Sequence, residues 1–173
     1  GDMIDGFTID TYSNLGTGCA FPGASNFSDY TGLGSVVTLI QSSTYNVTCA
    51  PGPSWGQYFA VWIDLNQDGD FDEANEFFDI GYAAAGVSIT TPITIPTGAL
   101  GGNTQLRVLC HYGTGAINQP DACLAQTYGE VEDYIVTLSS SPPFEASAIS
   151  VDGPTTGCGL GMETVSATFQ NNG

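Results

Sequence analysis

The stretch YFAVWI at residues 58–63, followed directly by DLNQDGDFD at residues 64–72, decides the fold class. A short run of aromatic and aliphatic residues without helical spacing is typical of a buried β-strand. The loop that follows carries an oxygen-bearing side chain at every second position, and Gly69 permits a sharp turn within it. This combination predicts a β-protein with a cation-binding loop between strands.

The rest of the chain repeats the strand pattern without any amphipathic helix. Clusters of Gly, Pro, Ser and Asn separate the apolar runs. The other predicted strands are 6–11, 35–40, 45–49, 76–82, 88–95, 105–112 and 130–138. We therefore expect an all-β fold, an antiparallel β-sandwich of the jelly-roll or immunoglobulin-like kind with an inter-strand calcium loop.

A run of serines and prolines at residues 139–143 divides the chain. Proline lacks the amide donor of a strand and stiffens the backbone, so residues 140–143 are predicted to link a first domain, 1–139, to residues 144–173. The second segment holds two predicted strands, 146–151 and 164–170. It is shorter than the roughly 40 residues that fold unaided, and we interpret it as the truncated start of a second β-domain.

The charge balance excludes several partners. The 173 residues include 18 Asp and Glu against a single basic residue, Arg107, which gives a formal net charge of −17. Such a chain repels nucleic acid and anionic lipid. No apolar run approaches the ~20 residues of a membrane-spanning helix. The five cysteines show no metal-binding spacing and favour a secreted or cell-surface protein with disulfides.

The acidic loop is a candidate calcium site. Alternating oxygen donors let a short loop wrap a hard cation, and no lysine is present to offset the charge. The EF-hand pattern fails, because Asn75 stands at its twelfth position and a strand rather than a helix precedes the loop. The predicted ligands of Ca²⁺ are Asp64, Asn66, Asp68, Asp70, Asp72 and Glu76.

A second acidic element lies at the start of the last strand of the first domain. By strand alternation Glu130 and Glu132 share a face with Tyr134. Carboxylates on a face that points to the core need partners. They either bind the metal or pair with Arg107, and the bland alternative is a solvated strand entrance. The sequence does not choose among the three.

Several motifs resemble the GEVED domain family, a module of secreted bacterial multidomain proteins. The sequence GEVED itself stands at residues 129–133, with DYT at 29–31, WIDLNQDGDF at 62–71 and ITIPTGALGGNTQLRV at 93–108. The resemblance spans residues 4–138. It implies a β-sandwich accessory domain that accompanies peptidases, glycosidases or adhesin repeats, with calcium at the WIDxNxDG loop. The scarcity of positive charge and the Gly/Ala loop at 83–86 depart from the family pattern.

The cysteine pairing is a separate prediction. Cys110 and Cys123 bracket a loop that returns toward Gly129, and we predict that they pair. Cys19 and Cys49 form the other predicted disulfide, although four cysteines allow three connectivities. Cys158 would then find its partner in the remainder of the second domain or stay free.

Catalysis finds little support in the sequence. A G-x-S-x-G match around Ser54 is preceded by prolines and lacks the strand-to-helix context of a nucleophile elbow. His111 is the only histidine, and it lies within a predicted strand. Trp55 and Tyr58 are candidate sugar-stacking residues, with packing in the core as the alternative for Tyr58.

These observations predict a non-catalytic, calcium-stabilised, extracellular adhesion or assembly module of a larger secreted or cell-surface bacterial protein. Its expected partners are an extracellular polysaccharide or a surface protein, together with further domains of the same chain. No nucleic acid and no membrane insertion are expected. A carbohydrate-binding module attached to a polysaccharide-degrading enzyme is one alternative, and a subunit or repeat of an extracellular filament is another.

Overall fold

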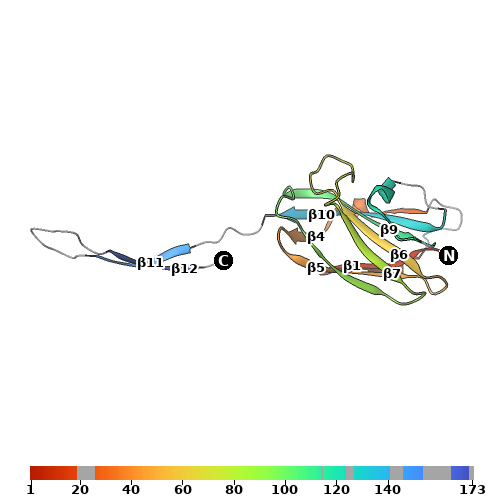
Figure 1. The fold of residues 1–173 in the computed structure, drawn as a ribbon, viewed down its shortest axis with the longest axis horizontal. Coiled ribbons are helices and arrows are strands. Elements are labelled where there is room, and N and C mark those ends of the chain that lie inside the picture. Colours follow the sequence, from red (N-terminus) through yellow and green to blue (C-terminus); the bar gives the residue numbers. More distant parts are fainter. Residues whose placement is uncertain (19–25, 114, 124–126, 141–145, 154–164, 172–173) are drawn as a thin grey trace, which may run out of the picture. The chain divides into compact units, whose positions relative to one another are not determined.

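The computed structural model describes residues 1–18, 26–113, 115–123, 127–140, 146–153 and 165–171. It divides the chain into two compact units, Gly1–Ser140 and Ser141–Gly173. The described elements are twelve strands and two short 3₁₀-helices, η1 (Thr31–Leu33) and η2 (Gln119–Cys123) (Figure 1). None of the described helices is long and apolar enough to cross a membrane.

The first sheet of the larger unit is antiparallel throughout. Its order is β2-β1-β5-β8, and the strands are β2 (Tyr12–Leu15), β1 (Ile4–Ile9), β5 (Thr44–Pro51) and β8 (Ile89–Thr94). Paired threonines line its solvent face, where the Thr48 and Thr90 hydroxyls lie 2.7 Å apart. The sequence analysis did not predict β2.

The second sheet is larger and mixed. Its path is β3-β10-β9-β6-β7, with β4 also paired to β10. The strands are β3 (Phe27–Asp29), β10 (Gly129–Ser139), β9 (Gly102–His111), β6 (Gln57–Ile63), β7 (Phe77–Ala83) and β4 (Ser35–Ile40). β3 and β4 lie parallel to β10, which corrects the expectation of purely antiparallel pairing. Parallel pairing is open to them because most of the first unit lies between these strands in the chain and serves as the crossover.

The main core lies between the two sheets. Phe7 of the first sheet contacts Tyr134 of the second with ring centroids 5.2 Å apart. Along β6, Phe59, Val61 and Ile63 point into this core, as the alternation of a strand requires. The β-sandwich prediction is therefore confirmed.

A smaller core, which we call the outer core, covers the opposite face of the second sheet. Trp62 and Leu109 project outward and are buried by Phe71, Ile117 and Ala122. The Trp62 indole donates a hydrogen bond to the carbonyl of Gln119 in η2, at 3.0 Å. β6 is thus buried on both sides, which explains why its sequence is apolar throughout rather than alternating.

The single arginine belongs to this outer face. Arg107 makes a bidentate ion pair with Asp133, its cross-strand neighbour, with Nε–Oδ1 and Nη2–Oδ2 distances of 2.7 Å. Its guanidinium also donates to the carbonyl of Ala122 and stacks over the ring of Phe71. One residue therefore ties β9, β10, η2 and the acidic loop together.

The cysteine pairing predicted from the sequence is wrong for Cys110 and Cys123, which are both free thiols. Cys110 points into the main core, whereas Cys123 is exposed beside Arg107 on the outer face, so the sheet separates them. Cys49 is likewise free and buried, which removes the predicted bridge to Cys19. Cys19 and Cys158 lie outside the described residues.

The smaller unit contains one antiparallel hairpin, β11 (Ala146–Asp152) paired with β12 (Ser166–Asn171). Its large apolar side chains are exposed: Ile149, Val151, Val165 and Phe169. A two-stranded hairpin has no second layer on which to bury such residues. The predicted linker at 140–143 lies, apart from Ser140, outside the described residues.

Candidate metal centre

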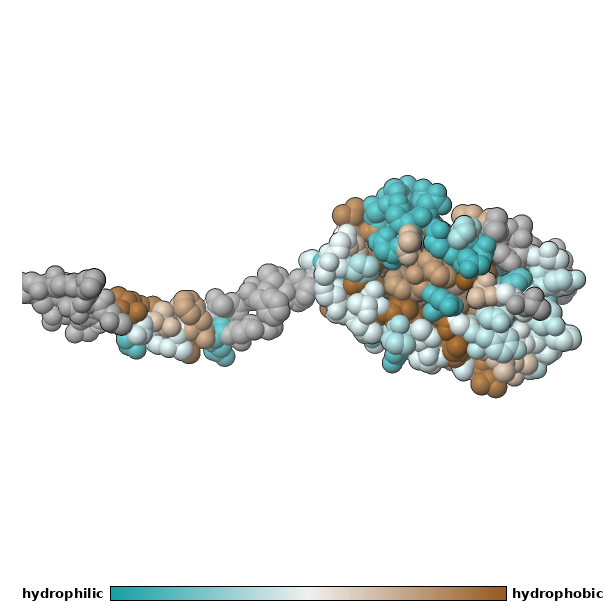
Figure 2. Space-filling model, in the orientation of Figure 1, coloured by the Kyte–Doolittle hydropathy of each residue, from teal (hydrophilic) through white to brown (hydrophobic). Residues whose placement is uncertain are grey.

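The acidic loop joins the end of β6 to the start of β7 and spans residues 64–76. In Figure 1 it is the olive loop that stands above the strands of the larger unit, and Figure 2 shows a hydrophilic surface at this place. Its stem is anchored to β9 and to the connection before this strand. The Thr104 hydroxyl donates to the carbonyl of Asp64 at 2.6 Å, and Leu100 N–H donates to the carbonyl of Leu65 at 2.8 Å.

Side-chain hydrogen bonds to the backbone shape the loop. Asn66, Asp68 and Asp70 each accept a hydrogen bond from the backbone N–H two residues later, at 3.0 to 3.2 Å. Such Asx turns are a common local conformation of these residue types. Gly69, with φ of 94°, supplies the left-handed conformation that the turn requires. At the far end Phe71 anchors the loop in the outer core, because Gln119 donates to its carbonyl at 2.8 Å.

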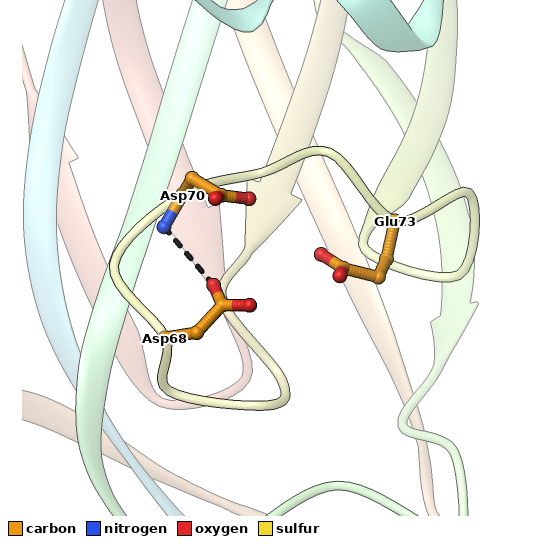
Figure 3. Close-up of side chains that lie close together, drawn as sticks. All are labelled: Asp68, Asp70 and Glu73. Carbon is orange, nitrogen blue, oxygen red and sulfur yellow. Dashed lines mark hydrogen bonds between the residues drawn. The ribbon is translucent and has the colours of Figure 1, made fainter.

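Three carboxylates converge within the loop. Asp68, Asp70 and Glu73 each place one oxygen within 4.8 Å of the others. Figure 3 shows Asp68 and Asp70 on one arm of the loop and Glu73 facing them across it. Asp68 and Asp70 are exposed, and Glu73 is half-buried.

Two further carboxylates form the base of the loop. Glu76 is fully buried, and its Oε1 accepts hydrogen bonds from the backbone N–H groups of Leu65 and Asn66, at 2.6 and 3.2 Å. Asp64 is 6% exposed, and its Oδ2 accepts from Gly69 N–H at 3.2 Å. Burial raises the pKa of Glu76 to about 7, and repulsion from Glu73 and Asp64 acts in the same direction.

The oxygens that remain fit a hard cation. Asp64 Oδ1, Glu73 Oε2 and Glu76 Oε2 are buried and have no hydrogen-bond partner within the described part of the chain. Buried acceptors without a partner are costly, and a divalent cation would satisfy several at once. These donors are carboxylate oxygens, and this all-oxygen set suits calcium rather than a thiophilic metal.

The predicted loop ligands divide into groups. Asp68 and Asp70 lie together, and Asp64 and Glu76 form the base. The Asn66 side chain is engaged within the loop, because its amide donates to Asp68 Oδ2 at 2.8 Å and its Oδ1 accepts from Asp68 N–H. Asp72 is exposed and lies outside the group of three converging carboxylates.

Glu73 was missed by the sequence analysis. It breaks the alternation that identified the other donors, because the chain turns at residues 73–76, where Glu76 N–H donates to the carbonyl of Glu73 at 3.1 Å. This turn brings the side chain back toward Asp68 and Asp70. The signal in the sequence was the acidic residue three positions before Glu76.

Glu130 and Glu132 do not belong to this loop. Strand register places them in the rows of Phe59 and Val61, about 16 and 10 Å before Asp64 at roughly 3.3 Å per residue. Both are buried in the main core: Glu130 accepts from Ile4 N–H and the Ser28 hydroxyl, and Glu132 accepts from the Tyr134 hydroxyl at 2.7 Å. Neither pairs with Arg107, which lies on the other face with Asp133. The structure therefore places both carboxylates in the main core with hydrogen bonds from Ile4, Ser28 and Tyr134, rather than beside Arg107 or at a solvated strand entrance.

Burial raises the pKa of both carboxyls. Burial, followed by repulsion from Glu130, raises the pKa of Glu132 to about 7, against the hydrogen bond from Tyr134 that lowers it. Burial also raises the pKa of Glu130. Glu132 Oε1 has no hydrogen-bond partner among the described residues. The pKa values of both carboxyls are therefore shifted toward the protonated form.

The candidate sugar-binding residues lie at the opposite end of the second sheet from the acidic loop. Trp55 is 50% exposed immediately before β6, and Tyr58 is half-buried at its start. Tyr58 rests against the outer core, so the expectation of core packing holds for part of this side chain.

Comparison with known families gives one finding. Residues 58–137 match the family model described as GEVED domain, a range that runs from β6 into β10 and contains the acidic loop. None of the curated proteins matches the chain significantly.

Proposed function

We propose that this chain, whose residues 58–137 match the family model described as GEVED domain, is a non-catalytic, calcium-stabilised adhesion or assembly module of a larger secreted or cell-surface protein. The observation that carries the proposal is the set of buried carboxylate oxygens of Asp64, Glu73 and Glu76 in the acidic loop, which have no hydrogen-bond partner among the residues that the structure describes. A positive ion that offsets this charge stabilises a loop of this kind.

Calcium would bind to Asp68, Asp70 and Glu73, with Asp64 and Glu76 beneath them. The ion supplies positive charge and accepts several oxygen ligands in a flexible geometry, which suits a loop without a fixed octahedral arrangement. Its role is structural. The loop connects β6 to β7 and contacts the outer core through Phe71, so neutralising it stabilises the second sheet.

The scarcity of catalytic groups supports a non-catalytic role. The chain has one histidine, no lysine, and one arginine that is already paired with Asp133. Ser54 lies in an exposed segment before β6, without the strand-to-helix turn of a hydrolase nucleophile. The carboxylates of the loop are explained by the cation.

The charge of the chain supports the choice of partners. At −17, it repels nucleic acids and anionic membranes, so an uncharged polysaccharide or a surface protein suits it better.

The raised pKa of the buried thiol of Cys110 makes it unreactive, which is compatible with an oxidising, extracellular compartment.

Thermal unfolding with and without calcium tests the proposal. A site that binds calcium only in the folded state adds about 2.7 kcal/mol at a hundredfold excess over Kd, which corresponds to a rise in Tm of about 5–10 °C. We expect this rise for the wild-type chain on addition of CaCl2 after EDTA treatment. Asp68→Asn, an exposed change, should reduce it.

Asp10→Asn is the matched control. It removes the same charge from an exposed turn between β1 and β2, where φ is 51° and asparagine is equally tolerated. The control should keep the full response to calcium. A Tm that is the same in CaCl2 and in EDTA would contradict the calcium assignment.

A further inference from the structure

One side chain anchors the middle of the acidic loop. Phe71 is the only large apolar residue at positions 66–76. Its ring is 6% exposed and packs in the outer core, although its neighbours Asp70 and Asp72 are exposed. The backbone is held at the same point, because the Gln119 side chain donates a hydrogen bond to the Phe71 carbonyl at 2.8 Å. The loop is therefore fixed to the sheet between its two ends.

This anchor separates the carboxylates that converge within the loop. Asp68 and Asp70 precede Phe71 in the chain, and Glu73 follows it. Figure 3 shows Glu73 facing the other two across the loop, and one oxygen of each lies within 4.8 Å of the others. A shift of the chain at Phe71 would move Asp70 and Glu73 relative to each other. The position of the anchor therefore determines the separation of the carboxylates.

Arg107 of β9 holds the anchor in place. Its guanidinium lies over the Phe71 ring, 5.4 Å from the ring centroid. A cation is attracted to the face of an aromatic ring, and the attraction grows where water is excluded. The guanidinium is itself fixed, because Asp133 accepts two hydrogen bonds from it, both at 2.7 Å, and the carbonyl of Ala122 accepts a third at 2.9 Å.

Asp133 links this arrangement to the last strand of the larger unit. It is the final residue of the GEVED sequence at 129–133 and is 3% exposed. Its carboxylate also accepts a hydrogen bond from the Gln105 side chain at 2.7 Å, so its orientation is defined from two sides. Asp133 thus fixes Arg107, which in turn fixes Phe71.

We propose that Phe71, Arg107 and Asp133 are positioning residues of the calcium site, which hold the two arms of the loop at the separation that the ion requires without serving as ligands. A loop that is already ordered needs less rearrangement when the ion binds, and this raises the affinity. The inference rests on the proposed function and deepens it, since it names residues outside the ligand set that determine the affinity of the same site.

A positional effect and a direct charge effect have opposite signs for Arg107. The arginine carries a positive charge, and its removal would leave the carboxylate of Asp133 without its partner. If the charge of Arg107 dominated, its loss would strengthen the binding of a cation, because a repulsive charge would disappear. If its position dominates, as we propose, its loss weakens binding. The direction of the change in affinity therefore distinguishes the two mechanisms.

Isothermal titration of CaCl2 into the EDTA-treated, dialysed full chain tests the inference. We expect Phe71→Ala and Arg107→Met each to bind calcium about tenfold more weakly than the wild-type chain, a change of ~1.4 kcal/mol. Phe71→Leu keeps an apolar anchor but removes the aromatic face, so its affinity should be intermediate. All titrations are made well below the Tm of each variant, with circular dichroism to confirm that the chain is folded.

Val47→Ala is the control for general destabilisation. Val47 is fully buried in the main core on β5 of the first sheet, so its truncation removes packing without touching the outer core. This variant should have a lower Tm in EDTA and an unchanged Kd for calcium. The positioning variants should differ from it in losing affinity as well as stability, and the rise in Tm on addition of CaCl2 should shrink only in them.

Four outcomes decide the matter. Weaker binding in both positioning variants, with Val47→Ala unchanged, supports the inference. Unchanged affinity in Phe71→Ala and Arg107→Met, or stronger binding in Arg107→Met, would overturn it while the wild-type chain still binds calcium. An equal loss of affinity in Val47→Ala would also overturn it, since the effect would then follow from stability alone. A wild-type chain that binds no calcium would overturn the proposed function and this inference with it.

Discussion

Glu76 closes the acidic loop by accepting a hydrogen bond from the backbone N–H of Leu65, at 2.6 Å. The two residues stand at opposite ends of the loop, eleven positions apart in sequence. One carboxylate oxygen thus fastens the two ends of the loop, while the other, Oε2, is buried without a hydrogen-bond partner among the described residues. Glu73 and Asp64 lie close enough to Glu76 to raise its pKa by repulsion, and this concentration of buried negative charge is the physical basis of the calcium proposal.

The base of the loop is expected to be more sensitive to substitution than its rim. Glu76→Gln keeps the size of the side chain but replaces a charged acceptor of two backbone N–H groups, so it should lower the free energy of unfolding by about 1–3 kcal/mol in CaCl2. Urea unfolding monitored by fluorescence measures the loss. Asp72→Asn, an exposed change nearby, should cost less than about 0.5 kcal/mol. Equal losses for the two variants would contradict this division of the loop.

The buried pair in the main core should make stability depend on pH. The pKa of Glu132 is raised in the folded state to about 7 from an ordinary value of 4.5. The folded state therefore binds a proton that the unfolded state has released, and stability is full below about pH 4.5 and falls as the pH rises to about 7. The groups that share its surroundings are Glu130, Tyr134, Tyr12, Tyr30, Cys49 and Cys110.

Glu132→Gln removes this dependence, because glutamine fills the site without a charge. The variant should lose less stability than the wild-type chain between pH 5 and pH 8 by about 1–3 kcal/mol, measured by urea unfolding in saturating CaCl2. Asp10→Asn should keep the wild-type profile. Parallel profiles for Glu132→Gln and the wild-type chain would show that Glu132 is ionised in both states.

The ion pair on the outer face should be costly to break from one side. Arg107→Met leaves Asp133, which is 3% exposed, without its partner and removes the contact with Phe71. We expect a loss of about 2–4 kcal/mol in the free energy of unfolding. The double variant Arg107→Met with Asp133→Asn should recover part of the loss, since no unpaired charge remains. Additive losses would mean that the two side chains do not interact.

The described cysteines should differ in reactivity. Cys123 is exposed, whereas Cys49 and Cys110 are buried and burial raises the pKa of both thiols. In the native protein iodoacetamide should label Cys123 and spare Cys49 and Cys110, which should react only after unfolding. Peptide mapping by mass spectrometry measures each site. A disulfide-linked peptide containing Cys110 and Cys123 would contradict the structure.

The sequence predicted the sandwich because most of its signals are local. The alternation that places Glu130 and Glu132 on the face of Tyr134 is a property of one strand, and the structure confirms it. The partners of these residues come from distant strands, since Glu130 binds Ile4, which is 126 positions away. No local pattern contains that pairing.

The loop was predicted in part for the same reason. Asp68 and Asp70 follow the alternation of donors and lie together, whereas Glu73 enters the site through a turn that the alternation does not encode. The disulfide prediction failed because proximity in sequence does not specify the face of a sheet. Cys110 and Cys123 are close along the chain but lie on opposite sides of the second sheet.

Isothermal titration of calcium into the EDTA-treated, dialysed chain tests the calcium assignment most directly. The structure predicts saturable binding of a single ion by the acidic loop, with affinity reduced at least about tenfold, or ~1.4 kcal/mol, in Asp68→Asn and unchanged in Asp10→Asn. An absence of binding heat with the wild-type chain folded, or binding that Asp68→Asn and Asp70→Asn leave unchanged, would contradict a calcium site in this loop.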